Sequence, residues 1–383
     1  MNILRCFIVC LFLWATSQSS AMPLSPQAEI SILTCAPGTE LYSLFGHTAI
    51  RVADPIQKID VVFNYGTFDF RTPHFYLKYA KGLLLYQLSV TSYESFISSY
   101  ILDERSVWSQ TLQLDSLTKQ RLFDNLLENR QPENRTYLYN FLFDNCSTRV
   151  RDIINKSTQQ SIEWHIPETD KSFWNLLDEY LCRMPWVKWG IHTILGQTGS
   201  RIATPYETMF LPDYLMQGLA SATDQGELLA QPAIAVFEAP ETALHNPWYF
   251  SPFFVFCIGS ILIILILQRY TSGKVLTAFT FPLFLTSGLI GMLLIFLGYF
   301  TLHPMTAPNY NLIWANPLNF IAAFFFLKKK LPRLIRNYLG LYLLVLLVGL
   351  PCWFFLQPAV PLSTFPLLCL LIYLSILLRK RKV

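Results

Sequence analysis

Five apolar runs in the last third of the sequence constrain its fold more strongly than any other feature. Each is close to the length that an α-helix needs to cross a bilayer, although the third, which Asn316-Pro317 interrupts, and the fifth are short. The chain is 52% hydrophobic and only 14% charged, which is too apolar for a purely soluble protein. These observations predict an all-α membrane domain of about five transmembrane helices over residues 251–383. The runs are residues 253–268, 279–300, 312–327, 338–356 and 362–378.

The positive charges between these runs predict their direction across the membrane. Lysine and arginine gather after the first run, after the third run and at the end of the chain, whereas residues 301–311 and 357–361 contain neither. Because positively charged loops stay on the cytoplasmic side, we expect the C-terminus in the cytoplasm and residues 22–250 outside. The net charge of +4 then reflects membrane topology, and it predicts no nucleic-acid partner.

The first 21 residues resemble a secretion signal. A positively charged start through Arg5 precedes a short apolar run, residues 6–14, and then the small residues Ser-Ser-Ala. This order is typical of a cleavable signal peptide at residues 1–21, and an uncleaved membrane anchor is the alternative. A signal peptide exports the chain that follows it, so it predicts the same orientation as the loop charges.

Residues 22–250 are predicted to form one α+β domain. A Ser116 cap precedes the clearest amphipathic helix, and Gly66 is expected to break the third strand. Strands are predicted at 30–35, 48–52, 59–65 and 83–90, and helices at 92–102, 117–127, 146–154, 170–182 and 207–221.

Three cysteines, Cys35, Cys146 and Cys182, lie in this outside domain. An odd number in an oxidising compartment leaves at least one thiol unpaired, and a Cys35–Cys182 disulfide is one possibility that spacing alone does not decide. Cys146 follows Asp-Asn at the predicted start of a helix, where unpaired backbone N–H groups and the helix dipole favour the thiolate. A half-buried cysteine under a helix cap is the simpler interpretation of the same pattern.

A cysteine nucleophile needs a base, and His47 is the most informative histidine outside the membrane. It lies in Leu-Phe-Gly-His-Thr-Ala-Ile-Arg-Val, so that Gly46 permits close backbone approach and a strand follows. A histidine at the start of a strand, facing a cysteine at the start of a helix, is typical of thiol hydrolases and acyltransferases. Asn64 is the first choice for orienting the imidazole, with Tyr65 and Asp69 behind it, and a turn residue is the alternative for Asn64.

Four motifs in order resemble the bacterial lipoprotein N-acyltransferase family called Lnb. The resemblance covers essentially the whole mature chain and implies a periplasmic thiol domain with C-terminal membrane spans in the bacterial inner membrane. It carries His47 and Cys146 over as the catalytic pair, whereas Asn64 is matched by strand position only. The motifs are Leu-Thr-Cys-Ala-Pro-Gly, Leu-Tyr-Ser-Leu-Phe-Gly-His-Thr-Ala-Ile-Arg-Val, Asn-Tyr-Gly-Thr-Phe and Phe-Asp-Asn-Cys-Ser-Thr-Arg-Val-Arg-Asp.

The order of His47 before Cys146 also resembles circularly permuted papain-like folds, such as lecithin:retinol acyltransferase. Together these resemblances imply transfer of an acyl chain from a membrane phospholipid, through a thioester on Cys146, to a diacylated lipoprotein. The acceptor would be the α-amino group of the diacylglyceryl-cysteine. No cofactor and no metal are expected.

Further residues are predicted to bind substrate. Tyr65 lies beside Asn64, and Arg149 could hold a phosphate, although an ion pair with Asp144 is the alternative. The uncharged loop, residues 301–311, and the start of the third run place polar and aromatic groups at the membrane interface. There they would either bind a lipid headgroup or only anchor the ends of the helices at the interface. Those residues are His303, Trp314 and Asn316, with Asn309 and Asn311 nearby.

Two other classes of protein remain open from the sequence. A membrane-tethered, papain-like cell-wall peptidase would use the same cysteine and histidine, but it has no evident need for five spans. A non-enzymatic membrane assembly protein would tolerate loss of either residue.

Overall fold

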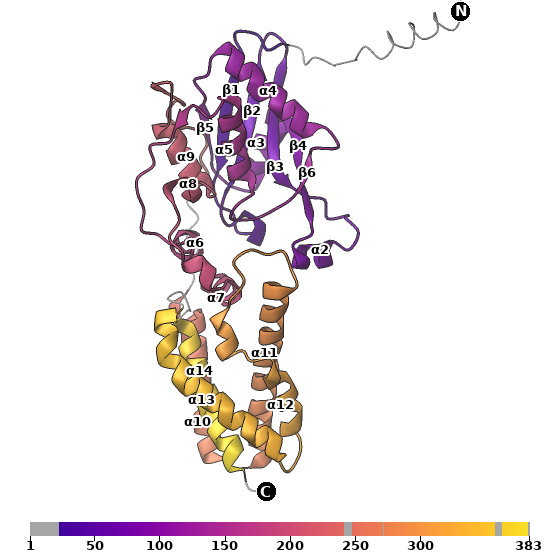
Figure 1. Ribbon diagram of the computed structural model, residues 1–383, viewed down its shortest axis with the longest axis vertical. Coiled ribbons are helices and arrows are strands. Elements are labelled where there is room, and N and C mark those ends of the chain that lie inside the picture. Colours follow the sequence, from indigo (N-terminus) through magenta and orange to yellow (C-terminus); the bar gives the residue numbers. More distant parts are fainter. Residues whose placement is uncertain (1–22, 241–246, 271, 357–361, 382–383) are drawn as a thin grey trace, which may run out of the picture.

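The computed structural model describes residues 23–240, 247–270, 272–356 and 362–381 (Figure 1). An α+β domain occupies one end of the molecule and a bundle of apolar helices the other, which confirms the predicted fold class. The predicted signal peptide, residues 1–21, lies outside the described residues.

A seven-stranded sheet forms the centre of the α+β domain. Its order is β10-β5-β1-β2-β3-β4-β6, and every neighbouring pair is antiparallel. The four predicted strands are confirmed as β1 to β4. Gly66 does not break β3, which continues to Thr67 with a register shift between Asn64 and Thr67. The strands are β1 Glu29–Cys35, β2 His47–Asp54, β3 Ile59–Thr67, β4 Leu85–Ser92, β5 Val107–Thr111, β6 Thr136–Leu138 and β10 Ile234–Phe237.

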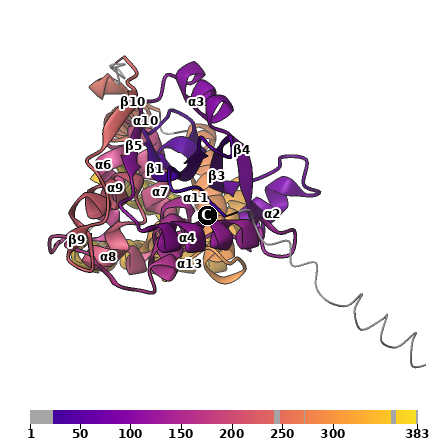
Figure 2. The same cartoon turned by 90° about the horizontal axis from the view of Figure 1, so that it is seen from above.

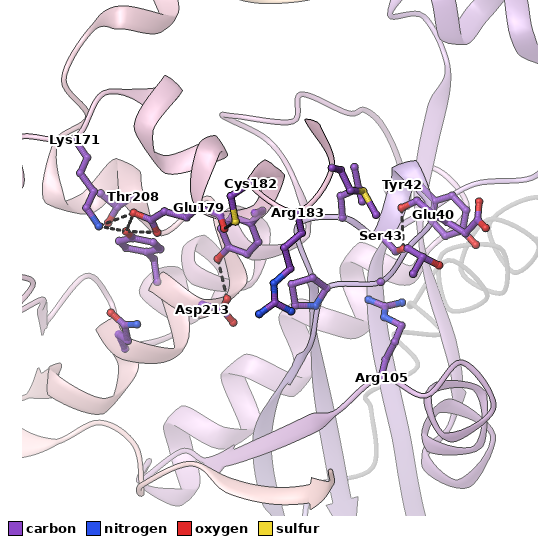
Figure 3. A pocket seen from close by; sticks show the side chains of 18 of the residues that line it. Glu40, Tyr42, Ser43, Arg105, Lys171, Glu179, Cys182, Arg183, Thr208 and Asp213 are labelled. Atoms are coloured by element: carbon purple, nitrogen blue, oxygen red, sulfur yellow. Dashed lines mark hydrogen bonds and ion pairs between the residues drawn. The ribbon is translucent and has the colours of Figure 1, made fainter. Parts of the chain in front are cut away.

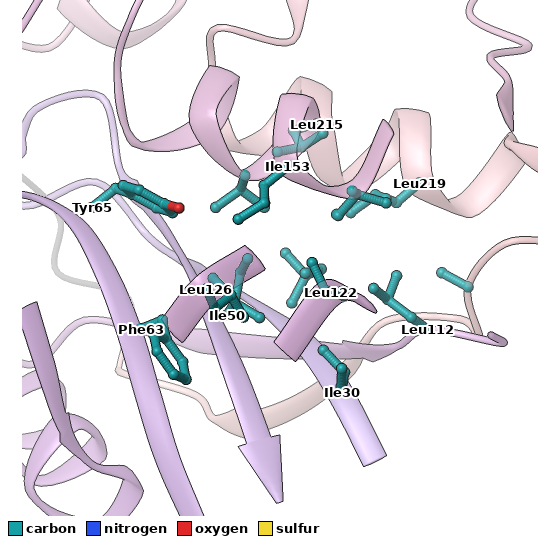
Figure 4. Close-up of a cluster of buried hydrophobic side chains, with 14 of the residues drawn as sticks. Ile30, Ile50, Phe63, Tyr65, Leu112, Leu122, Leu126, Ile153, Leu215 and Leu219 are labelled. Atoms are coloured by element: carbon teal, nitrogen blue, oxygen red, sulfur yellow. The ribbon is translucent and has the colours of Figure 1, made fainter. Parts of the chain in front are cut away.

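Helices cover both faces of this sheet (Figure 2). On one face α4 (Ser116–Arg130), α5 (Cys146–Ser157) and α9 (Pro212–Ser221) enclose the larger core (Figure 4). On the other face α3 (Tyr93–Leu102) packs on a smaller core that includes Leu33 and Cys35. Alternate strand residues supply the two cores, because successive side chains of a strand point to opposite faces. Three two-residue strands, β7 Ile162–Glu163, β8 Thr223–Asp224 and β9 Glu227–Leu228, form a separate small sheet.

Two of the predicted helices differ from those observed in their cap or their continuity. Asp115, not Ser116, caps α4, because its carboxylate accepts a hydrogen bond from the Thr118 backbone N–H at 2.7 Å. The helix predicted at 207–221 is split into α8 (Pro205–Thr208) and α9, because Pro212 begins a new helix. The remaining described helices of this domain are α2 Phe75–Lys81, α6 Phe173–Leu181 and α7 Pro185–Ile194.

The C-terminal region contains a helix at each of the five apolar runs. Among the described residues, three segments are long and apolar enough to cross a membrane, namely Pro252–Arg269, Gly273–Tyr299 and Leu362–Lys380. The third run differs from a full span, because only nine of its residues form α12, about 14 Å of helix. The helices are α10 Pro252–Arg269, α11 Gly273–Tyr299, α12 Leu318–Phe326, α13 Arg333–Leu356 and α14 Phe365–Lys380.

The segment before α12 is irregular but well bonded inside the protein. Trp314 is fully buried, its indole N–H donates to Asn311 Oδ1 at 2.9 Å, and its carbonyl accepts from the Tyr342 hydroxyl at 2.6 Å. Non-helical backbone at membrane depth is tolerated only where it is buried in protein in this way. The interruption by Asn316-Pro317 therefore delays the start of the helix to Leu318 without leaving the polar groups of the preceding segment in lipid.

The loop that follows α11 connects the two domains. The Leu302 backbone N–H donates to the Lys81 carbonyl at the end of α2. Asn309 Nδ2 donates to the carbonyls of Thr193 and Ile194 at the end of α7, both at 2.9 Å. The ends of the strands that carry His47 and Thr67 consequently face the membrane helices (Figure 1).

Close packing of α11 against the segment that leads into α12 generates a prediction. A Cβ at Gly291 would lie 2.0 Å from the Ala315 carbonyl oxygen, so Gly291→Ala is expected to cost about 1–3 kcal/mol of stability. Melting of the detergent-solubilised protein, followed by intrinsic fluorescence, measures this cost.

Gly259→Ala on α10 is the matched control for Gly291→Ala. Nothing lies within 4 Å of its Cβ position, and alanine is the better helix former by about 1 kcal/mol. It should melt at or above the wild-type temperature. Equal melting temperatures for the wild type and Gly291→Ala would contradict the described packing.

Candidate active site

Asn145 places Cys146 at the first residue of α5. Its Oδ1 accepts from the Thr148 backbone N–H at 2.9 Å, and its own backbone N–H donates to Thr148 Oγ1 at 2.7 Å. These two bonds form a capping box. The Asn145 amide also donates to the carbonyls of Phe141 and Phe210, both at 2.8 Å. The buried cap therefore ties the helix start to two other segments of the chain.

His47 and Asn64 come to this thiol from neighbouring strands. Asn64 Oδ1 accepts a hydrogen bond from His47 Nε2 at 2.6 Å, and the His47 ring is also hydrogen-bonded to the Cys146 side chain. Since Nε2 is engaged by Asn64, Nδ1 is the ring nitrogen left for the thiol. The structure thus brings together all three residues that the sequence selected for the centre of the site.

The turn before His47 depends on glycine. Gly46 has a φ of +77°, in the left-handed region, and a Cβ there would lie 2.7 Å from the Cys35 carbonyl oxygen. The chain can therefore turn tightly from the loop into β2 and place the imidazole at the end of the sheet.

The thiol and the imidazole stabilise each other's charged forms. Burial raises the pKa of Cys146. The His47 charge and hydrogen bond, together with the Thr48 backbone N–H, lower this pKa by more than burial raises it, so the net pKa lies below 9.0. Burial likewise lowers the pKa of His47, and its interactions with Cys146 and Asn64 bring the net pKa above 6.5. A buried charge needs a partner of opposite charge, and here the Cys146 thiolate and the His47 imidazolium are partners for each other. The arrangement favours a thiolate–imidazolium pair, which is the reactive form of a cysteine nucleophile.

Gly66 and Tyr139 belong to the same site, and sequence reasoning missed this role for both. A Cβ at Gly66 would lie 3.6 Å from Cys146 Cβ, 3.4 Å from Tyr139 Cε2 and 4.0 Å from His47 Cε1. Gly66 also has a φ of +85°. Its place next to Tyr65 in a strand was a detectable signal, because glycine inside a strand often marks close approach by another group.

Tyr65 and Arg149 have protein partners near the thiol. Tyr65 is buried, and its hydroxyl accepts from Asn129 Nδ2 at 2.8 Å. Arg149 makes two bonds to the Asp144 carboxylate, at 2.6 and 2.8 Å, and its guanidinium lies 3.4 Å from the Tyr137 ring centroid. The alternative ion pair expected for Arg149 is therefore present.

The three residues predicted at the membrane interface also contact protein. His303 Nε2 donates toward the carbonyls of Tyr79 and Ala80, at 3.2 and 3.1 Å. Asn316 Oδ1 accepts from the Leu318 backbone N–H at 3.0 Å, at the start of α12, and Trp314 is buried as described above. The His303 contacts join the two domains, and the Asn316 contact lies at the start of a helix. Substrate binding by these three residues stays a prediction.

The cysteine pairing left open by the sequence does not occur in this structure. Cys35, Cys146 and Cys182 are all free thiols. Cys35 is buried beside Tyr100, and burial raises its pKa to about 12, whereas Cys182 is exposed. Among the described residues, no group of three or more His, Cys, Asp or Glu side chains is arranged to hold a metal ion.

A cavity of about 1310 Å³ elsewhere in the domain does not include the thiol site (Figure 3). Residues 37–44 and 103–105 form one side, and residues 166–171 and 179–184 form the other, where Lys171 Nζ pairs with Glu179 Oε1 at 2.6 Å. Cys146, His47 and Asn64 are absent from its lining. The thiol site, unlike this cavity, brings a cysteine together with a histidine that can act as its base, so it is the candidate active site.

These observations define a membrane-anchored α+β domain with a thiol–imidazole–amide site at its membrane-facing end. Two family models match the chain, the Lnb N-terminal periplasmic domain over residues 23–177 and the Lnb transmembrane domain over residues 244–382. The chain belongs to the Lnb family, and its N-terminal domain is periplasmic. Membership supports lipoprotein N-acylation as the general activity. Searches of curated proteins and of solved structures found no match.

The coupling of the thiol and the imidazole predicts a pH profile. Alkylation of Cys146 by iodoacetamide is expected to be half-maximal below pH 9.0, because His47 lowers the pKa of this thiol. In His47→Ala the strongest interactions that lower this pKa are lost, while burial and the smaller effects of Thr48 and Ser147 remain, so the profile should move to higher pH. Mass spectrometry of the Cys146 peptide, sampled over time at each pH, measures both profiles.

The exposed Cys182 in the same digest is the internal reference for reagent reactivity. Asn64→Ala should shift the Cys146 profile in the same direction as His47→Ala but by less, because it removes one hydrogen bond to the imidazole. Superimposable Cys146 profiles for wild type and His47→Ala would show that the two groups are not coupled.

Proposed function

We propose that this protein is a lipoprotein N-acyltransferase that carries the acyl group on Cys146. The donor is a membrane phospholipid, and the acceptor is the α-amino group of a diacylglyceryl-cysteine lipoprotein. The observation that carries the proposal is the contact of Cys146 with His47 and of His47 with Asn64, at strand ends that face the membrane helices. A thioester suits this transfer, because amines attack it more readily than an oxygen ester.

In the first half-reaction the Cys146 thiolate attacks a phospholipid ester carbonyl. A C–S bond forms, the C–O bond to glycerol breaks, and His47 gives its proton to the departing oxygen, so a lysophospholipid leaves. In the second half-reaction the lipoprotein amine attacks the thioester, and His47 accepts the proton that the amine loses. The C–S bond breaks as the amide forms, which restores the thiolate–imidazolium pair.

The start of α5 supplies groups for the transition states of both steps. The Thr148 N–H is bonded to Asn145 Oδ1 and the Arg149 N–H to the Asn145 carbonyl. The N–H groups of Cys146 and Ser147 precede the first intrahelical bond. They are the donors that we assign to the oxyanion, a contribution often worth about 10²–10³ in rate. Asn64 is a positioning residue, because it acts through its bond to His47 Nε2.

The membrane domain keeps the thiol where both substrates are found. Phospholipid and diacylated lipoprotein are each anchored in the periplasmic leaflet of the inner membrane. The loop after α11 ties the α+β domain to the helices at Lys81 and Thr193, so the domain stays attached at the membrane surface. This arrangement supports the orientation with the C-terminus in the cytoplasm.

The covalent intermediate provides the direct test. Incubation of the purified full-length protein with phospholipid should add one acyl mass to Cys146, which hydroxylamine removes. Cys146→Ala should show no adduct, and His47→Ala should form it at least 10²-fold more slowly, because the thiolate loses its partner and its proton donor. Intact-protein mass spectrometry follows all three proteins.

The same variants separate the rival classes. Both Cys146→Ser and His47→Ala should abolish lipoprotein N-acylation in cells that depend on this chain. Continued N-acylation by Cys146→Ser would refute the thioester mechanism, and full activity of both variants would indicate an assembly protein. Cleavage of labelled muropeptides, without an acyl adduct, would instead identify a peptidase.

A further inference from the structure

A row of aromatic rings leads from the thiol site towards the membrane helices. It consists of Tyr139, Tyr86, Phe68, Phe75 and Tyr79, which together form the aromatic ladder. Successive ring centroids are 4.4, 5.1, 5.7 and 6.4 Å apart. Tyr79 is exposed and the other four side chains are partly buried, with Tyr86 and Tyr139 packed against the larger core, so the ladder runs from the edge of that core to the surface.

One end of the ladder touches the catalytic site. The Tyr139 ring lies 3.4 Å from the Cβ position of Gly66, which is itself 3.6 Å from Cys146 Cβ. The Tyr86 ring then stacks on Tyr139 at an interplanar angle of 24°. A chain attached to the Cys146 sulfur would meet these two rings as it leaves the site.

The other end of the ladder touches the membrane domain. Tyr79 belongs to α2, and the carbonyls at the end of that helix accept hydrogen bonds from His303 and Leu302, just beyond α11. Tyr299 and Phe300 at the end of α11 are 66% and 69% exposed. Exposed aromatic side chains at the end of an apolar span are typical of a membrane–water interface.

The helix α2 has the composition of a lipid-contacting element. It contains no buried residue, and Tyr76 is 81% exposed. Lys78 and Lys81 give it a basic last turn, and neither forms an ion pair with a carboxylate in the described part of the chain. An apolar surface with unpaired lysines suits an anionic lipid surface.

We propose that the aromatic ladder binds the acyl chain of the donor phospholipid, with its ester carbonyl at Cys146 and its tail directed to the end of α11. This inference rests on the proposed function. Moving an acyl chain from lipid into water is unfavourable, and the rings provide apolar surface along the whole path. The four ring-to-ring steps follow a path of the same order as one leaflet of hydrocarbon, about 15 Å.

Photo-crosslinking tests the location directly. The full-length protein is placed in vesicles of phospholipid with a diazirine near the end of one acyl chain, irradiated, digested and mapped by mass spectrometry. Cross-links in residues 68–86 and at Tyr139 are expected, in addition to those in the membrane helices. Cross-links confined to α10–α14 would overturn the proposal. If the ladder cross-links but Cys146 never acquires an acyl group, the proposed function is refuted, whereas the assignment of the ladder as a lipid-binding surface still holds.

Chain-length selectivity tests the energetic role. Phe75→Ser and Tyr79→Ser should each reduce, by about tenfold, the ratio of Cys146 acylation rates with palmitoyl and hexanoyl phospholipids. Both donors react at the same thiol, so this ratio does not depend on how much of a variant is folded.

Ile56→Ser is the matched control for these two variants. Ile56 is 63% exposed, in the turn between β2 and β3 at the opposite ends of the strands, so the ratio should stay at the wild-type value. A ratio unchanged in both ladder variants would overturn the proposal.

Discussion

The buried side chain of Asn145 is the constraint on which the thiol site depends. It caps α5 through Thr148 and holds the carbonyls of Phe141 and Phe210, so three segments meet at the residue before Cys146. Buried polar groups without hydrogen-bond partners would cost stability. Because the Asn145 side chain bonds to all of these groups, it orders the start of the helix. The sulfur can then face His47, and that contact outweighs the effect of burial on the pKa of both groups. The chemistry thus follows from one well-satisfied helix cap.

The second constraint is the attachment of the α+β domain to the membrane helices. Residues 301–316 are not a passive connection, since they bond to the ends of α2 and α7 and pack around the buried Trp314. The strand ends with His47 and Thr67 are consequently held towards the lipid side of the domain. The proposed reaction, between two membrane-anchored substrates, needs this orientation more than it needs a deep pocket. The cavity bounded by residues 37–44 and 166–171 lies apart from the thiol and plays no part in the proposed steps.

Much of the fold could be predicted because its signals are local. Strands β1 to β4, helix α5 and the apolar helices lie where periodicity and composition place them. The errors came from competition between neighbouring signals. Asp115 displaced Ser116 as the cap of α4, Pro212 divided the predicted helix at 207–221, and Pro317 shortened the third apolar run to α12. Among the site residues, Cys146, His47 and Asn64 could be selected from their positions in elements, and the place of Gly66 inside a strand was a signal that could have selected it. Tyr139 could not be selected, because only the folded domain brings it next to Gly66.

The sequence by itself determined which residues carry reactive groups, which segments are apolar enough to enter a membrane, and the family to which the chain belongs. These properties reside in side-chain chemistry and in short-range spacing. Only the tertiary structure decided that His47 bonds to Asn64 through Nε2, that Cys35 and Cys182 remain free, and that Trp314 is buried between helices. Each of these outcomes depends on the distance between residues far apart in the chain, and packing sets that distance.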